Sequence, residues 1–251
     1  MKYNTEKLEN KTALITGATS GIGLACAHYL GQLGVKLSLV ARRESKLLEL
    51  QKLYSCKIII GDLNKETTIK RMNEDGFFSS DIVINNAGLA LVKDSFVDIS
   101  DEDMELVLQT NIHAAFKVAK YSIKEMMNRS SGDLINICSI ASHEAYSGGA
   151  VYCASKHALL SLGKALREET YGQNIRVINV SPGLVQTEFS NVRFKGDEQK
   201  AAKVYEGMSP LQPQDIAWQI VNALQTPRHV NLDEIIILAT DQAGATKVKR
   251  S

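Results

Sequence analysis

Two residues four positions apart, Tyr152 and Lys156, could carry out acid–base chemistry together. Residues at this spacing lie on one face of a helix, so a phenol and an ammonium group would be neighbours. An isolated tyrosine has a pKa of about 10, and a nearby cation stabilises its phenolate. The pair is therefore predicted to exchange a proton with a substrate oxygen, with Lys156 lowering the pKa of Tyr152.

Two further polar residues complete a candidate catalytic set. Ser139 follows an apolar run, and its hydroxyl is expected to hydrogen-bond the substrate oxygen as the charge on that oxygen changes. Asn111 lies inside a predicted helix, where an amide is unusual because it competes with the backbone; a water held there could link Lys156 to solvent. Each residue also has a structural alternative. Tyr152 could be a core aromatic, Lys156 a surface charge, Asn111 incidental, and Ser142 rather than Ser139 a helix cap.

A glycine-rich turn at Thr16–Gly23 is a candidate site for a phosphorylated cofactor. Glycine permits a tight turn, lets the backbone approach a pyrophosphate and packs the following helix close to the sheet. Free N–H groups at the start of that helix would face the anion. Glycines also serve ordinary turns, but this turn joins the first predicted strand to the first helix. The residues predicted to contact the cofactor here are Gly17, Thr19, Ser20, Gly21, Ile22 and Gly23.

The end of the second predicted strand indicates which dinucleotide binds. Arg42 and Arg43 stand where a carboxylate would bind the ribose hydroxyl of NAD, and arginine there accommodates the extra phosphate of NADP. A guanidinium suits phosphate because its fork of donors matches the oxygen atoms. The alternative is a solvated pair of arginines at the start of a surface helix. The position favours NADP.

Two more predicted strands end in polar residues that could line a cofactor groove. Asp62 could accept a hydrogen bond from the adenine amino group, with Leu63 beside it, or it could be the N-cap of a helix that begins near Asn64. Asn86 and Gly88, in the sequence Asn85-Asn86-Ala87-Gly88, could hold the sheet edge together, line the groove, or do both.

Seven short apolar runs alternate with helical patterns, which predicts a parallel sheet buried on both faces. We therefore expect an α/β fold in which residues 1–251 form a single Rossmann-type, doubly wound domain with seven parallel strands. No internal repeat, linker or low-complexity segment is present. The predicted strands are 13–15, 37–40, 58–60, 82–84, 134–137, 177–180 and 235–238.

Helices are predicted between these strands, and one segment has no regular pattern. The helices cover 21–33, 44–54, 101 to about 129, and about 150–171. The irregular segment, residues 187 to about 207, precedes the last helix. In such a sheet, ligands bind outside the carboxyl ends of the strands, so this segment is predicted to be a substrate loop that acts as a lid.

The composition excludes several classes of function. The formal net charge of +1 does not fit a nucleic-acid-binding protein, and no apolar run is long enough to span a membrane. Residues 1–7 are charged and lack the apolar stretch of a signal peptide. The four cysteines have no metal-ligand spacing, so we expect no metal, reduced thiols and a cytoplasmic protein. Cys153 could be redox-sensitive, although a packed thiol is the simpler interpretation.

The chain resembles the short-chain dehydrogenase/reductase family over essentially its whole length. The motifs that carry the resemblance are TGxxxGIG at 16–23, NNAG at 85–88, the helix residue Asn111, Ser139, YxxxK at 152–156, and PGxxxT at 182–187. The resemblance implies carbonyl–alcohol interconversion by an Asn–Ser–Tyr–Lys tetrad, with a small-molecule substrate and a homo-oligomer, either a dimer or a tetramer. It also implies that Tyr152 and Lys156 contact the cofactor and that Pro182, Gly183, Val185 and Thr187 lie at its nicotinamide end.

A narrower resemblance points to the substrate. The segment 187–197, the arginine pair and the sequence Tyr146-Ser147-Gly148-Gly149 are similar to NADP-dependent serine 3-dehydrogenases, which implies L-serine, L-allo-threonine or related 3-hydroxy acids. A 3-hydroxy acid needs a cation opposite its carboxylate, so Arg193 is the candidate binder, and Ser139 and Tyr152 would hold the hydroxyl. Arg193 could instead be an exposed loop residue, in which case Lys195 is the next candidate.

The sequence thus predicts an NADP-dependent oxidoreductase and leaves two alternatives. The same chemistry could reduce 3-oxoacyl thioesters, diketones or other ketones. A non-catalytic dinucleotide sensor is a different class, which can lose the tetrad without losing the fold, whereas this chain retains it. His143 and Glu144, just beyond Ser139, could also border the pocket.

Overall fold

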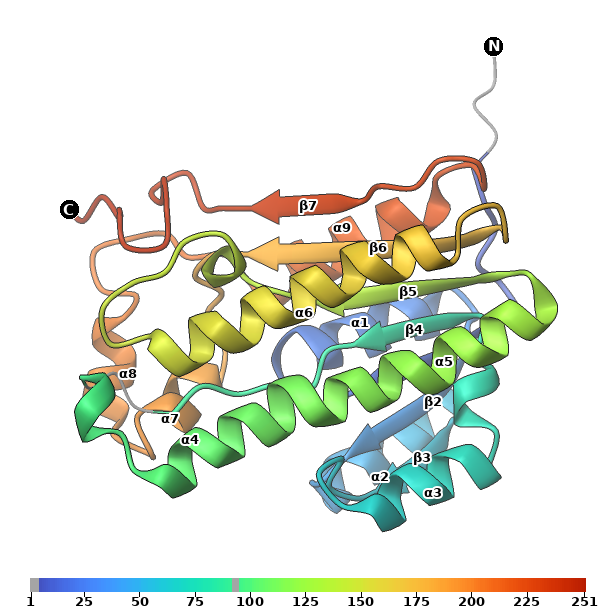
Figure 1. Cartoon of the computed structure of the whole chain (residues 1–251), viewed down its shortest axis with the longest axis horizontal. Helices are drawn as coiled ribbons and strands as arrows, with labels where there is room; N and C mark the ends of the chain where they lie inside the picture. The colour runs from blue at the N-terminus through green and yellow to red at the C-terminus, as the bar shows by residue number, and fades with distance from the viewer. Residues whose placement is uncertain (1–4, 92–94) are drawn as a thin grey trace.

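The computed structural model describes residues 5–91 and 95–251, and contains one sheet of seven parallel strands in the order β3-β2-β1-β4-β5-β6-β7 (Figure 1). The predicted doubly wound α/β fold is confirmed. Residues 1–4, part of the terminus for which no leader was predicted, lie outside the described residues. The strands are β1 (Thr12–Thr16), β2 (Lys36–Ala41), β3 (Lys57–Ile60), β4 (Ile82–Asn85), β5 (Gly132–Ile137), β6 (Ile175–Pro182) and β7 (Glu234–Ile237).

The helices are close to those expected from the sequence. The long ones are α1 (Gly21–Gln32), α2 (Glu44–Tyr54), α3 (Glu66–Glu74), α5 (Ala115–Arg129), α6 (Ala150–Glu169) and α9 (Pro213–Gln225). The short ones are α4 (Asp101–Leu108), α7 (Phe189–Arg193) and α8 (Glu198–Lys203). Three 3-10 turns, η1 (Phe77–Ser79), η2 (Phe96–Asp98) and η4 (Ile140–Ser142), and one π-helical turn, η3 (Gln109–Ala114), complete the set in the described residues.

Successive residues of each central strand face opposite sides of the sheet, and each side has its own apolar core. Ala13 and Ile15 of β1 pack with α1, α2 and α9, whereas Leu14 packs with α3 and α5 on the other side. Figure 1 shows α4, α5 and α6 in front of the sheet and α1 and α9 behind it. Burial on both faces explains why the strands are continuous apolar runs rather than alternating ones.

The irregular segment predicted at 187–207 is more ordered than expected. It contains α7 and α8, so the prediction of an unstructured loop is wrong. Both helices are about one to two turns long, which is too short to show an apolar repeat in the sequence. They lie beyond the carboxyl ends of the strands (Figure 1). We call residues 187–207 the lid, after the function predicted for them; closure over a ligand stays a prediction.

The helix predicted from 101 to about 129 is continuous in space but changes its hydrogen-bond pattern midway. Residues Gln109–Ala114 form a π-helical turn, η3, between α4 and α5. Asn111, the residue singled out as unfavourable for an α-helix interior, lies in this turn. Such π turns are rare and occur frequently at functional sites.

No described helix combines the length and hydropathy needed to cross a bilayer. Within residues 5–91 and 95–251, no three His, Cys, Asp or Glu side chains are grouped so that they could bind a metal ion.

Candidate active site

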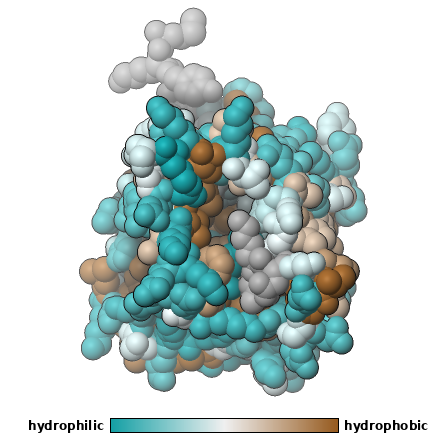
Figure 2. Space-filling view, turned by 90° about the vertical axis from the view of Figure 1, so that its left-hand side faces the viewer, coloured by the Kyte–Doolittle hydropathy of each residue, from teal (hydrophilic) through white to brown (hydrophobic). Residues whose placement is uncertain are grey.

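A pocket of about 800 Å³ lies beyond the carboxyl ends of the strands. Figure 2 looks onto this end of the molecule, where apolar side chains lie in a hollow between hydrophilic rims. Every residue assigned to the site from the sequence lines the pocket except Gly23 and Asn111. The lining residues are Gly17, Thr19, Ser20, Gly21, Ile22, Arg42, Arg43, Asp62, Leu63, Asn86, Gly88, Ser139, Tyr152, Lys156, Pro182, Gly183, Val185, Thr187 and Arg193.

The glycine-rich turn has the geometry that its glycines permit. Gly17 and Gly21 have φ angles of +66° and +51°, the left-handed region that other residues rarely adopt. A Cβ at Gly23 would lie 2.5 Å from both Gly17 O and Asn86 Nδ2, so α1 begins in close contact with the turn. Asn86 Nδ2 donates to Thr16 O at 2.8 Å, so Asn86 holds the turn and lines the pocket. Both sequence interpretations of this asparagine therefore hold.

The two arginines after β2 have different surroundings. Arg42 is exposed and lines the pocket. Arg43 donates to Thr19 O at 2.8 Å and to Thr19 Oγ1 at 3.2 Å, and it forms an ion pair of 2.6 Å with Glu188 of the lid. Arg43 therefore joins the glycine-rich turn to the lid, while Arg42 lines the pocket.

Asp62 does not cap the helix that follows it, so that alternative is wrong. The helix α3 begins at Glu66 with Lys65 as its N-cap, two residues later than expected. Asp62 Oδ1 instead accepts a hydrogen bond from Asn64 N at 3.0 Å, which is the geometry of an Asx turn. Its other carboxylate oxygen remains available at the pocket, beside the buried Leu63.

The segment after β6 connects the sheet to the glycine-rich turn. Gly183 N donates to Ile237 O at 2.8 Å, which fixes the Pro182–Gly183 corner against β7. A Cβ at Gly21 would lie 3.2 Å from Thr187 Cγ2. The start of the lid thus packs directly over the turn predicted to bind phosphate.

Ser139 and Tyr152 meet at the end of β5. Ser139 Oγ accepts from Ala141 N at 3.1 Å, and Ser142 Oγ accepts from Ser139 N at 3.2 Å. Both serines therefore cap η4, and the choice posed between them was unnecessary. The side chain of Ser139 also hydrogen-bonds Tyr152. This places a hydroxyl and a phenol side by side at the pocket wall.

Lys156 is buried, and its ammonium group is held by the backbone. Its Nζ donates to Ile137 O at 2.7 Å and lies 6.0 Å from the centre of the Tyr152 ring. A Cβ at Gly88 would lie 3.4 Å from Lys156 Nζ and 3.2 Å from Asn111 Oδ1, so both side chains face Gly88.

Asn111 is committed to neighbouring loops. Its Oδ1 accepts from Leu89 N at 2.8 Å, and its Nδ2 donates to Leu89 O at 2.7 Å and to Ser155 Oγ at 3.0 Å. These bonds tie the π turn to the segment after β4 and to α6. One lone pair of Oδ1 remains for a further donor. The water relay from Lys156 stays a prediction.

The expected lowering of the Tyr152 pKa by Lys156 is not what the structure gives. Burial raises the pKa of Tyr152 above its ordinary value, and the hydrogen bond from Ser139 and the charge of Arg193 oppose that rise. Burial also lowers the pKa of Lys156, which weakens its hold on a positive charge. Desolvation disfavours the charged forms of both groups, and the sequence argument considered only their mutual attraction.

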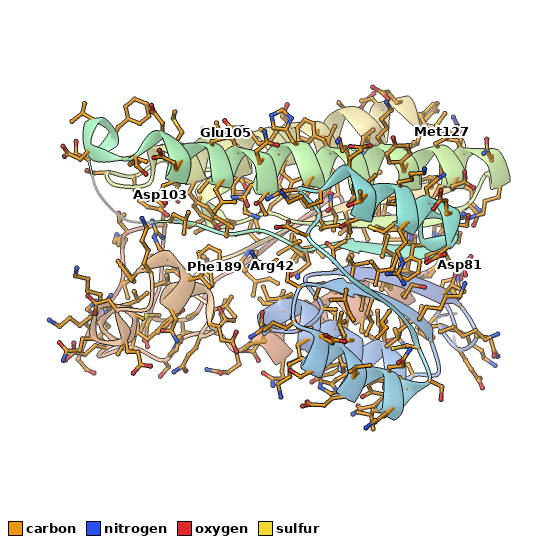
Figure 3. The ribbon with its side chains drawn as sticks, turned by 90° about the horizontal axis from the view of Figure 1, so that it is seen from below. Arg42, Asp81, Asp103, Glu105, Met127 and Phe189 are labelled. Carbon is orange, nitrogen blue, oxygen red and sulfur yellow. The ribbon has the colours of Figure 1, made fainter. Side chains whose placement is uncertain are left out.

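Arg193 points into the pocket, between two tyrosine rings. Its Cζ lies 5.8 Å from the centre of the Tyr152 ring and 5.7 Å from that of Tyr146. Nη1 donates to Tyr146 Oη at 3.3 Å. Nε and Nη2 are buried and have no hydrogen-bond partner among the described residues. Lys195, the second candidate, forms an ion pair of 2.6 Å with Asp103 instead; Figure 3 shows Asp103 on the side of α4 that faces the lid.

His143 and Glu144 do not line the pocket. His143 Nε2 is 3.0 Å from Ser181 Oγ and 2.9 Å from Glu234 Oε1, and Glu144 accepts from Ala245 N at 2.7 Å. These contacts fix the loop after Ser139 against β6, β7 and the chain that follows them. Cys153 is a buried free thiol, consistent with the simpler interpretation.

The sequence argument missed part of the pocket wall. Phe189 lies 5.7 Å from Tyr152, ring centre to ring centre, and Figure 3 shows it near the middle of the molecule, toward Arg42. Gln242 Oε1 accepts from Leu184 N at 2.8 Å, and Thr246 and Val248 add to the lining. Phe189 lies two residues after the PGxxxT segment, and this proximity was a usable signal. Gln242 had none, because its partner is 58 residues away.

The pocket fits a phosphorylated dinucleotide. It extends from Arg42, past the glycine-rich turn, to Tyr152 and Lys156 in one continuous cavity. Side chains larger than hydrogen at Gly17 would approach Asn86 Nδ2 within 2.9 Å, so the turn remains free of Cβ atoms where a pyrophosphate must approach.

Comparison with known proteins agrees with this geometry. The sequence model of the short chain dehydrogenase family matches residues 11–198. The chain belongs to the short-chain dehydrogenase family. It is therefore an oxidoreductase of that family, as its motifs predicted.

Within this family, the chain is similar to several named dehydrogenases. The chain is 39% identical to the NADP-dependent 3-hydroxy acid dehydrogenase of Schizosaccharomyces pombe, over 97% of this chain and 98% of that protein. It is 34% identical to the enzyme of the same name from Escherichia coli, over 92% and 96% of the two chains. The closed form of a serine dehydrogenase solved with NADP+ superposes with a TM-score of 0.90 at 34% identity, over 96% of this chain and all of that one. The resemblance to the serine dehydrogenase group is confirmed.

Proposed function

We propose that the protein is an NADP-dependent dehydrogenase of small 3-hydroxy acids such as L-serine or L-allo-threonine. The observation that carries the proposal is the pair of buried N–H groups on Arg193, Nε and Nη2, which have no partner within the described residues and lie beside Tyr152. Buried polar groups are normally hydrogen-bonded, so we expect these two N–H groups to bind an anionic ligand. A carboxylate matches a guanidinium fork with two parallel hydrogen bonds.

The choice of NADP rests on Arg42, which is exposed at the adenosine end of the pocket. The names of the relatives from Schizosaccharomyces pombe and Escherichia coli support the same choice. Asp62, with one carboxylate oxygen available, would accept a hydrogen bond from the adenine amino group. Thr19, Ser20 and Ile22 would contact the pyrophosphate, and Pro182, Gly183, Val185 and Thr187 the nicotinamide end.

In the oxidation, the substrate alcohol loses a hydride from its carbinol carbon and a proton from its hydroxyl group. The nicotinamide ring of NADP supplies the hydride acceptor, and in the reverse direction the hydride donor. Tyr152 takes the hydroxyl proton as its phenolate, or returns it as the phenol. Ser139 hydrogen-bonds the same substrate oxygen. The product of oxidation is a 3-oxo acid, which can lose carbon dioxide without the enzyme.

The positions of Lys156 and Asn111 support a specific role for each. Lys156, held by Ile137 O, would bind the ribose hydroxyls beside the nicotinamide. Its Nζ lies 6.0 Å from the centre of the Tyr152 ring, from where it would stabilise the Tyr152 phenolate. Asn111, fixed by three hydrogen bonds, would hold the water through which Lys156 exchanges protons with solvent. Because burial raises the pKa of Tyr152, the phenol predominates at neutral pH, and reduction needs less adjustment there than oxidation.

Nicotinamide absorbance tests the proposal directly. The purified protein is mixed with NADP or NAD at about pH 9, and a panel is offered: L-serine, L-allo-threonine, 3-hydroxybutyrate, 3-hydroxypropionate and neutral secondary alcohols. Reduction of NADP by the acids, with little from NAD, supports both the Arg193 and the Arg42 assignments. If the acids give no reduction of NADP while ketones or 3-oxoacyl thioesters oxidise NADPH, the proposed substrate class is refuted and the catalytic assignment of the tetrad is retained.

A variant separates an enzyme from a dinucleotide sensor. Tyr152→Phe removes the phenol assigned to exchange the substrate proton, so turnover should fall by about two to four orders of magnitude. NADPH binding, measured by fluorescence titration, should be retained. Unchanged turnover in this variant would contradict the catalytic assignment.

We also propose that the chain forms a homo-oligomer, either a dimer or a tetramer, as the family resemblance implies. Mass measurement of the native protein in solution tests this. A monomer at assay concentration would refute it.

A further inference from the structure

Arg193 lies close to two aromatic rings. Its Cζ is 5.7 Å from the centre of the Tyr146 ring and 5.8 Å from that of the Tyr152 ring. A guanidinium over an aromatic face is attracted by the negative face of the ring. Of its donor atoms, Nη1 bonds Tyr146 Oη at 3.3 Å, and Nε and Nη2 have no partner in the described residues. Tyr146 thus occupies one side of the fork and leaves the other side available.

The backbone around Tyr146 is shaped to place that ring. Gly149 N donates to Tyr146 O at 3.1 Å, closing a turn in which Gly148 has a φ of +73°. A Cβ at Gly149 would lie 2.3 Å from Tyr146 Cε2. The ring therefore packs against a glycine that cannot be replaced without displacing it. This turn also leads directly into α6, which carries Tyr152 and Lys156.

Arg193 needs such support because its own element is short. It is the last residue of α7, which has five residues, and Lys195 just beyond it has a φ of +51°. A long side chain at the end of so short a helix loses rotamer entropy when it binds a ligand. Contacts with two rings reduce that loss, because they fix the side chain before the ligand arrives.

We propose that Tyr146 is a positioning residue that holds the Arg193 guanidinium over Tyr152, with Nε and Nη2 directed at the substrate carboxylate. Tyr146 itself does not touch the reacting atoms. The inference rests on the proposed function, because Arg193 must bind a carboxylate for its orientation to matter. It predicts that the hydroxyl and the ring of Tyr146 contribute separately to selectivity for acids over neutral alcohols.

The test compares Tyr146→Phe, Tyr146→Ala, Arg193→Met and the Tyr146→Ala/Arg193→Met double variant. Tyr205→Phe is the matched control, since this second pocket tyrosine bonds Val185 O at 2.8 Å and Ser190 rather than Arg193. The kinetic readout is KM and kcat for 3-hydroxybutyrate and for a neutral secondary alcohol. A second readout is inhibition of neutral-alcohol turnover by propionate, an unreactive carboxylate.

The expected results follow from what each variant removes. Tyr146→Phe loses one hydrogen bond and should raise KM for the acid and the inhibition constant of propionate by about twofold to tenfold. Tyr146→Ala also loses the ring and should raise both by about tenfold to a hundredfold. For the neutral alcohol, KM should stay within about twofold, and any change in kcat should be shared by both substrates, because Tyr146 and Arg193 both affect the pKa of Tyr152. Tyr205→Phe should not change the ratio of acid to alcohol efficiency.

The double variant shows whether Tyr146 acts through Arg193 or independently of it. Once Arg193 is methionine, Tyr146→Ala should cost nothing further for the acid, because its partner is gone. Additive losses, or equal losses for acid and neutral alcohol, would overturn the inference.

The same experiment separates this inference from the proposed function. If the wild-type protein does not oxidise 3-hydroxy acids but propionate inhibits it through Tyr146 and Arg193, the proposed function fails and the inference stands. If the acids are oxidised and the two substitutions are additive, the proposed function stands and the inference fails. If propionate does not inhibit the wild-type protein and the acids are not oxidised, the proposed function and the inference are both refuted.

Discussion

Replacing Arg193 with methionine should convert the enzyme from one selective for acids into one indifferent to charge. Methionine keeps an apolar stem of similar length and removes the guanidinium. In the structure, two buried N–H groups of Arg193 are available for a carboxylate. A hydrogen bond to a charged group contributes about 1.5–3 kcal/mol, and Arg193 is only half-buried, so we take the lower figure for each of the two bonds. The expected loss is about 3 kcal/mol, or about 150-fold in kcat/KM for 3-hydroxybutyrate.

The assay must separate substrate binding from the protonation state of Tyr152. The charge of Arg193 lowers the pKa of Tyr152, so Arg193→Met should raise that pKa further and move oxidation to higher pH for every substrate. Acid and neutral alcohol are therefore compared at one and the same pH, because a change in the Tyr152 pKa affects both substrates alike. The loss specific to acids should appear mainly in KM, since the carboxylate is bound equally in the ground state and the transition state.

Lys195→Met is the matched control for this prediction. It also removes one cation from the lid, but Lys195 pairs with Asp103 rather than lining the pocket. An exposed ion pair contributes about 0–1 kcal/mol, so acid selectivity should change by no more than about fivefold. The reasoning is refuted if Arg193→Met lowers kcat/KM equally for 3-hydroxybutyrate and a neutral secondary alcohol at the same pH, or if Lys195→Met gives the same selectivity loss.

Three further predictions concern the cofactor, the pH profile and stability. Arg42→Ala should raise KM for NADP by about tenfold to a hundredfold and leave KM for NAD unchanged; an equal rise for both would contradict its role. Oxidation needs the Tyr152 phenolate, whose pKa burial raises above about 10, so its rate should climb steadily from neutral pH, while reduction, which needs the phenol, should stay flat; a bell centred near neutrality would be inconsistent with this. Asp133→Ala leaves the buried Arg176 and the neighbouring Arg228 without their shared carboxylate and should lower the free energy of unfolding in urea by about 3–5 kcal/mol; a change below about 1 kcal/mol would show that the pair is dispensable.

The features predicted well from the sequence are those set by local chemistry. Gly17 and Gly21 predicted a tight turn, and both adopt the left-handed backbone that glycine permits there. Apolar runs such as 82–84 marked strands buried on both faces. The spacing of Tyr152 and Lys156 placed both on one face of α6 at the pocket.

The features missed depend on contacts between distant segments. The π turn at Asn111 is fixed by Leu89 and Ser155, which lie 22 and 44 residues away. The pKa of Tyr152 depends on how deeply the lid and α6 bury it, which no spacing reveals. The short helix α7 places Arg193 in the pocket, yet five residues are too few to show a helical period.

Transfer of deuterium from substrate to cofactor tests the central claim most directly. The wild-type protein is given 3-hydroxybutyrate labelled with deuterium at its carbinol carbon, together with NADP, and the NADPH formed is examined by mass spectrometry. The proposed reaction predicts NADPH that carries the single deuterium and a 3-oxo acid that has lost it. Unlabelled NADPH, or no NADPH with this acid while neutral alcohols react, would contradict the assignment of the protein as a 3-hydroxy acid dehydrogenase.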